Sequence, residues 1–117
     1  MTVQPEREAF VPRVVDDADA ENAVAIDRKA VELRGAGKSY GTIARSLGLE
    51  SPRSAHEAFS RGVRQRPAGE RAKLRQAESL RLDALADKTK ARTDLSSDQR
   101  SKRLRSIERL RQTVMMD

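Results

Sequence analysis

Apolar residues recur at helical spacing in successive segments of this chain, and glycine, proline and polar residues separate the segments. Tyr40, Ile43, Ala44 and Leu47 lie at i, i+3, i+4 and i+7, so a short helix places all four on one face. Gly48 follows, at a position where the positive φ of a helix end is accessible at little cost only to glycine. The pattern predicts a helix that ends at Gly48.

A second helix is predicted directly after that turn. Ser51 offers a hydroxyl that can cap a helix, and Pro52 suits the first helical position, where no N–H is needed. The apolar residues beyond it share one side, and they are Ala55, Ala58, Phe59 and Val63. The residues on the opposite side are polar or charged, and they are Arg53, Ser54, Glu57, Arg61 and Arg64. A helix, a glycine turn and a helix with a cationic outer face are typical of a helix-turn-helix unit, whose second helix enters the major groove of DNA.

Three more helices are expected around this unit. Residues 20–36 carry a stripe of apolar positions and end at two glycines, Gly35 and Gly37. Pro67 and Gly69 break the pattern, and residues 70–90 then continue without proline or glycine. Ser96 and Gln99 have capping-box spacing at the start of a last helix, whose apolar face is made of Leu104, Ile107, Leu110 and Val114. The fold class predicted is all-α, with an N-terminal three-helix helix-turn-helix domain followed by a two-helix antiparallel hairpin.

This pattern divides the chain into four parts. Residues 1–19, with scattered acids and no sustained periodicity, are expected to form a flexible acidic arm. Residues 20–66 form the DNA-binding domain, 67–69 a linker, and 70–117 a basic helical hairpin. Because the apolar stripes of the hairpin are narrow, we expect it to associate with other copies and make the protein a homo-oligomer. Closure of the hairpin onto the N-terminal domain is the alternative.

Charge is distributed unevenly along the chain. The 117 residues carry a net charge of +6, with 36% charged and 37% hydrophobic residues. Residues 1–27 contain two arginines and seven acids, whereas the remainder contains 22 basic and 11 acidic residues. A basic body of this kind favours a polyanionic partner, and double-stranded DNA fits the motif best. RNA is less favoured, because the second helix of the motif is suited to the major groove of DNA.

The sequence gives little indication of a catalytic site, a metal site or a membrane-spanning segment. His56 is the only histidine and there is no cysteine, so neither a metal site nor a nucleophile with its base can be assembled. We therefore expect no enzyme activity, no cofactor and no metal. The segment 35–39 is similar to the end of a P-loop, but Glu32 stands where that motif needs its first glycine. No apolar run is long enough to span a membrane, so a location in the cytoplasm of a bacterial host cell is expected.

The helix-turn-helix interpretation assigns roles to eight residues. Those expected to face the bases are Arg53, Ser54, Glu57, Arg61 and Arg64. Arginine can bind guanine through two hydrogen bonds, and a glutamate can accept one from cytosine. Those expected to anchor the flanking phosphates are Lys38, Arg45 and Arg66. Tyr40 and Phe59 fall on apolar stripes and are expected in the core, and His56 is expected to contact phosphate or to pack.

Residues 30–55 resemble the helix-turn-helix domains of actinobacterial phage and prophage proteins. The residues that carry the likeness are Leu33-Arg34, Gly37, Ser39-Tyr40, Ile43-Ala44, Leu47-Gly48 and Ser51-Pro52. Several such proteins are similar to phage terminase small subunits, and the segment 78–85 resembles the stretch that comes after their DNA-binding domain. The resemblance implies recognition of viral DNA for packaging, assembly into rings through a helical hairpin, and the terminase large subunit as a partner. The C-terminal part departs from that family, because it is short and very basic, with no distinct segment for the large subunit.

Two other functions fit the same features. One is a dimeric transcriptional regulator or nucleoid-associated protein, and the mass of the oligomer separates it from a packaging ring. The other is a protein-interaction adaptor whose basic helices bind an acidic partner. Strong, salt-dependent binding to mixed duplex DNA would argue against the adaptor.

Overall fold

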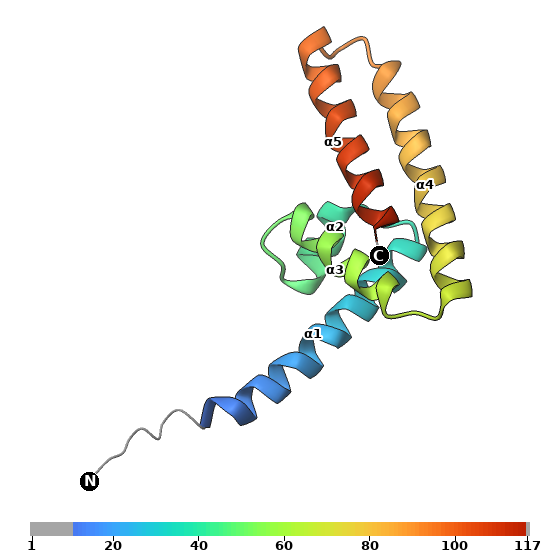
Figure 1. Ribbon diagram of the computed structural model, residues 1–117. Helices are drawn as coiled ribbons and strands as arrows, with labels where there is room; N and C mark the ends of the chain where they lie inside the picture. The colour runs from blue at the N-terminus through green and yellow to red at the C-terminus, as the bar shows by residue number, and fades with distance from the viewer. Residues whose placement is uncertain (1–10, 117) are drawn as a thin grey trace. The chain divides into compact units, whose positions relative to one another are not determined.

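The computed structural model describes the backbone of residues 11–116 and the side chains of residues 19–116, and within that range it contains helices and no strand (Figure 1). The helices are α1 (Val11–Gly35), α2 (Tyr40–Leu47), α3 (Pro52–Arg64), α4 (Ala68–Lys90) and α5 (Ser97–Met115). The all-α expectation is confirmed. None of these helices combines the length and the apolar character needed to cross a membrane. The chain forms two compact units, residues 1–62 and residues 63–117.

Helix α1 begins earlier than the sequence indicated. It starts at Val11 and not near residue 20, so residues 11–19 of the expected flexible arm are helical, and residues 1–10 lie outside the described range. The physical reason is that Pro12 falls in the first turn, where its missing N–H removes no helical hydrogen bond. No further proline or glycine follows until Gly35.

The expected linker at 67–69 is also shorter in the structure. Pro67 is the residue before α4, and Ala68 and Gly69 already belong to that helix. The two compact units divide between Gly62 and Val63, inside the last turn of α3, and not at residue 66.

The turn after α2 forms as predicted at Gly48 and Ser51, and Ser39 adds a cap at the start of α2 that was not predicted. The Ser39 hydroxyl accepts a hydrogen bond from the Thr42 N–H at 3.2 Å and caps the start of the helix. Gly48 ends it with φ +68°, and the next N–H, from Leu49, reaches the Ala44 carbonyl at 2.8 Å. Ser51 accepts from the Ser54 N–H at 3.2 Å, so α3 begins at Pro52 with its cap in place. Local chemistry therefore fixes both ends of the turn between α2 and α3.

Aromatic side chains make up the centre of the first unit. Tyr40 and Phe59 are buried, as expected, with ring centroids 5.9 Å apart. The His56 ring meets the Tyr40 ring edge-on at 5.0 Å, and the Arg34 guanidinium lies 4.1 Å from the centroid of the same ring. Ile43, which is buried completely, adds the largest aliphatic side chain. These contacts join α2 and α3 to the end of α1.

Helices α1 and α3 approach so closely that only glycine fits between them. A Cβ atom placed on Gly62 would lie 2.6 Å from the Asp27 carbonyl oxygen and 2.6 Å from a methyl group of Val31. Neither distance is compatible with ordinary van der Waals contact. The absence of a side chain at Gly62 therefore sets the separation of these two helices.

In the second unit, α4 and α5 lie side by side and run in opposite directions (Figure 1). Leu82, Ile107 and Val114 are buried. The Arg75 guanidinium of α4 donates to the carbonyls of Val114 at 2.9 Å and Met116 at 3.1 Å, where α5 ends and its last carbonyls lack helical partners.

The connection between α4 and α5 is held by side chains as well. The capping box predicted for Ser96 and Gln99 is present. Arg100 donates to the carbonyls of Arg92 at 2.8 Å and Leu95 at 2.7 Å, and hydrogen bonds from Arg92 hold the pKa of the Asp94 carboxyl below its ordinary value.

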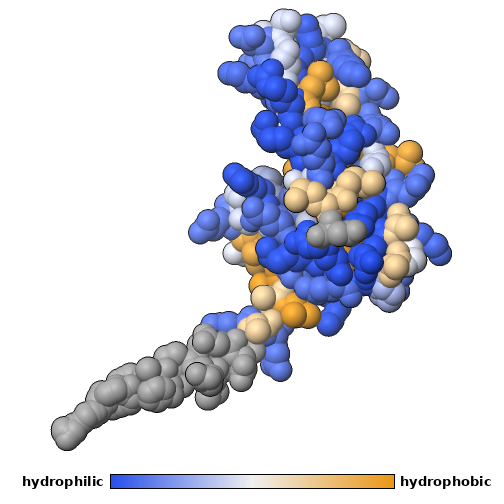
Figure 2. Space-filling view, in the orientation of Figure 1, coloured by the Kyte–Doolittle hydropathy of each residue, from blue (hydrophilic) through white to orange (hydrophobic). Residues whose placement is uncertain are grey.

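Helical spacing predicts an apolar stripe of Leu74, Ala77, Leu82 and Leu85 on α4, interrupted by Glu78 and Arg81, and this prediction is wrong for Leu85. Leu85 is 45% exposed, whereas Glu78 is completely buried and binds Arg81 through a 3.2 Å ion pair. Leu80 is exposed too, together with Met115 and Met116 beyond the apolar face of α5. Figure 2 shows a surface that is mostly hydrophilic over this pair, with separate hydrophobic areas. The hydrophobic residues of α4 thus belong to two faces.

Candidate nucleic-acid interface

The outer face of α3 carries the residues expected to read bases. Arg53 stands in the first turn with its side chain 88% exposed, and its Nε lies 3.6 Å from a carboxylate oxygen of Glu57, one turn later. This exposed ion pair holds Arg53 only weakly, because such a pair in water contributes well under about 1 kcal/mol to stability. The Arg53 guanidinium is therefore available to a ligand.

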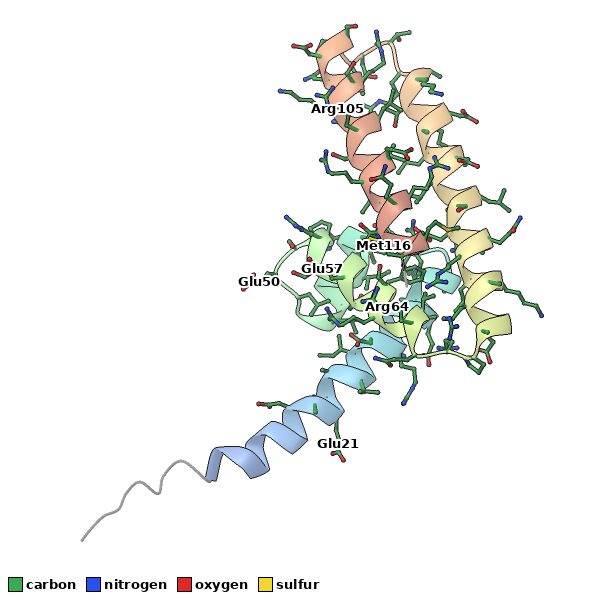
Figure 3. The ribbon with its side chains drawn as sticks, viewed as in Figure 1. Glu21, Glu50, Glu57, Arg64, Arg105 and Met116 are labelled. Atoms are coloured by element: carbon green, nitrogen blue, oxygen red, sulfur yellow. The ribbon has the colours of Figure 1, made fainter. Side chains whose placement is uncertain are left out.

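Other polar residues modify this face. Ser54 is half-buried, and its hydroxyl lies 3.2 Å from the Ser51 hydroxyl in the helix cap, so it is less open than predicted. Arg64 is exposed at the last residue of α3. Glu57 projects outward from α3, and Glu50 is exposed in the turn before it (Figure 3). The face carries carboxylates as well as guanidinium groups, a mixture that suits base edges better than a row of phosphates.

Arg61 has a different role from the one predicted. Its Nε and Nη2 donate to both carboxylate oxygens of Asp27 on α1, at 3.2 to 3.3 Å, and the Asp27 carboxylate is 3% exposed. The expectation that Arg61 faces the bases needs correction, because its guanidinium is engaged with a buried acid. The pair ties α3 to α1 one residue away from the close approach at Gly62.

Replacing Arg61 by glutamine is expected to lower the free energy of unfolding by about 1–3 kcal/mol. The physical reason is the loss of the bidentate, charge-assisted hydrogen bonds that the Arg61 guanidinium donates to the Asp27 carboxylate. Urea unfolding followed by circular dichroism measures the change. Arg64→Gln is the matched control on the same helix, since Arg64 is exposed and should change stability by less than about 0.5 kcal/mol. Equal stabilities of the two variants would contradict the tie between the helices.

The three predicted phosphate anchors fall in different surroundings. Lys38 is exposed in the turn between α1 and α2, and its carbonyl accepts from Arg34 at 3.0 Å. Arg45 is exposed on α2 and bonds the Thr42 hydroxyl at 3.2 Å. Arg66 lies in the second unit and pairs with Glu70 at 3.2 Å, at the start of α4. Lys38 and Arg45 thus belong to the same unit as the first three turns of α3, and Arg66 does not.

The charge of the two units differs strongly. Residues 1–62 contain nine basic and ten acidic residues, whereas residues 63–117 contain fifteen basic and eight acidic residues. The positive charge that pointed to a polyanion therefore belongs to the α4–α5 unit. The unit that contains the helix-turn-helix motif is almost neutral.

His56 is a packing residue and not a phosphate contact, because it is 3% exposed and lies against Tyr40. No cluster of three or more histidine, cysteine or acidic side chains suited to a metal ion occurs among the residues that the structure describes.

No family model matches the chain, and neither a curated protein nor a solved structure matches it.

Proposed function

We propose that this protein binds double-stranded DNA, with α3 placed in the major groove. In this proposal α1, α2 and α3 act as a three-helix helix-turn-helix domain, and the α4–α5 pair is the hairpin that comes after it. The observation that carries the proposal is the open N-terminal half of α3. Its cap at Ser51 is fixed, its apolar side is buried, and Arg53 projects from the exposed side. Recognition helices contact bases with such N-terminal residues.

The chemistry of this face supports discrimination between base pairs. Arg53 can donate two hydrogen bonds to guanine, and Glu57 can accept one from cytosine or hold Arg53 in place. Lys38 and Arg45 carry exposed cations beside the same motif and would contact phosphates. The ion pair between Arg61 and Asp27 holds α3 against α1 and so helps to fix its position. Arg64 extends the face toward the C-terminal end of the helix.

We also propose that the protein self-associates, and we consider two biological roles for it. Leu80 and Met115 on the α4–α5 unit support a homo-oligomer, because the described residues leave both apolar side chains exposed. Packaging of viral DNA, together with a terminase large subunit as partner, rests only on the resemblance of residues 30–55 and 78–85 to those phage proteins. A dimeric regulator acting on DNA in the bacterial cytoplasm is the second candidate, and a mass measurement of the free protein separates a dimer from a ring.

The proposal is tested by selecting sites for the full-length protein from a random-sequence duplex library. We expect a recovered site to bind at least about 10³ times more tightly than a mixed 30-base-pair duplex at physiological salt. We also expect the affinity for the mixed duplex to fall steeply with salt. Polyglutamate of similar length is the control. Binding of polyglutamate as strong as that of DNA, with no enriched site, would favour the adaptor and contradict the proposal.

A further inference from the structure

Most of the arginines of the second unit already have structural partners. Arg75 binds the end of α5, Arg100 binds the turn, and Arg81 pairs with buried Glu78. Arg111 of α5 binds Asp83 of α4 and also lies 3.3 Å from Glu108. These guanidinium groups hold the unit together, so fewer positive charges remain for a ligand than the sequence indicates. The positions of the remaining cations then decide where a ligand could bind.

Three of the cations without such a task lie together on the outer face of α5. Lys102, Arg105 and Arg109 are exposed and follow one another at spacings of three and four, so they form one row along the helix. The row lies opposite Ile107 and Val114, which face α4, and Arg105 projects away from α4 (Figure 3). Lys102 and Arg105 have no ion pair within the described part of the chain, and Arg109 donates only to the Ser106 hydroxyl, at 3.0 Å.

The acids of α5 do not neutralise this row. The helix contains six cations and two acids. Glu108 is paired with Arg111, and Asp98, one turn before Lys102 on the same face, forms no ion pair with it in the described part of the chain. Three positive side chains therefore remain on one exposed face, which we call the α5 row. A face needed only for solubility would gain from acids as much as from cations, and mixed charges are the usual solution.

We propose that the α5 row is a second DNA-binding surface, which contacts backbone phosphates without reading sequence. This inference rests on the DNA-binding function proposed above and adds a site that the helix-turn-helix motif does not include. From Lys102 to Arg109 the helix rises about 10 Å, a length over which each DNA strand presents about three phosphates. Because the first unit is nearly neutral, the α5 row supplies much of the salt-dependent part of binding.

The test compares two charge-matched variants of the full-length protein. K102Q/R105Q/R109Q removes the α5 row. K73Q/K88Q/K90Q removes three exposed lysines of α4 that have no ion pair among the described residues. Affinity for a mixed 30-base-pair duplex is measured by fluorescence anisotropy between about 50 and 200 mM salt. Over this range the affinity of a protein that contacts phosphates falls steeply.

We expect the α5 variant to bind the mixed duplex about tenfold or more weakly at the lower salt, and its logarithmic salt slope to fall by about 2–3. The α4 variant should change the slope by less than about 1. Equal slopes in the two variants would overturn the proposal. Helicity by circular dichroism checks folding, and the single variant R105Q, with an expected slope change of about 1, decides the matter if the triple variant is unfolded.

Other outcomes separate this inference from the proposed function. If the unaltered protein binds no duplex DNA at low salt, both are wrong. If R53Q/R64Q still discriminates a selected site from mixed duplex, the reading face is wrong, and the salt slopes alone decide on the α5 row. Tighter binding of an RNA duplex of the same sequence would overturn the choice of DNA as the ligand of the row.

Discussion

Replacing Arg53 and Arg64 together by glutamine is expected to remove most of the preference for a selected DNA site over a mixed duplex. Both side chains are exposed, and they lie eleven residues apart, about three helical turns, so they share one face of α3. Each lost contact between an arginine and a base costs about 1–3 kcal/mol, so the pair should reduce the preference by about 30-fold to 10⁴-fold. Competition binding with both duplexes measures the ratio.

The control for this variant is K73Q/K88Q, which lowers the net charge by the same amount from exposed positions on α4. It should weaken binding to both duplexes alike and leave their ratio unchanged, because it touches no base-reading residue. If the R53Q/R64Q ratio stays within about threefold of the unaltered protein, less than the effect of a single base contact, α3 does not read the site through these residues.

Gly62→Ala is expected to destabilise the first unit by about 1–3 kcal/mol or more. The added methyl group would meet the Asp27 carbonyl and Val31 at 2.6 Å, and the Asp27 carbonyl belongs to the helical backbone of α1, which cannot turn aside as a flexible side chain does. Alanine's better helix propensity, worth about 1 kcal/mol, offsets only part of this cost. Thermal and urea unfolding report the change.

Gly69→Ala provides the matched control, since Gly69 lies in α4 and a Cβ there has no neighbour within 4 Å. That variant should be neutral or more stable by up to about 1 kcal/mol. A Gly62→Ala variant as stable as Gly69→Ala would show that α1 and α3 do not lie as close together as the structure indicates. Because the clash also lies next to Arg61, the destabilised variant should discriminate poorly between DNA sites.

The parts of the fold that could be predicted are those encoded by neighbouring residues. Ser39, Gly48, Ser51 and the Ser96–Gln99 capping box each act on backbone groups within a few residues, so their effect can be read from the sequence. The exposure of Arg53 follows in the same way from its place in the first turn of α3. These local signals locate the candidate reading helix.

The contacts that could not be predicted join residues far apart in the chain. Asp27 and Arg61 are separated by 34 positions, and nothing near either residue indicates the other. The closeness of α1 to Gly62 depends on how two helices cross, which helical periodicity does not specify. The burial of Glu78 on α4 depends on its ion pair with Arg81, a partner that hydropathy does not count.

The near neutrality of the first unit has a consequence for how the protein would search DNA. A recognition helix in a nearly neutral unit gains little affinity from phosphates, which are the same in every DNA sequence. The helix would therefore dissociate quickly from the wrong sites and stay bound only where its side chains match the bases. Retention near the duplex between such trials would then fall to the other unit. Cellular salt would change how long the protein stays on DNA, and much less which sequence it prefers.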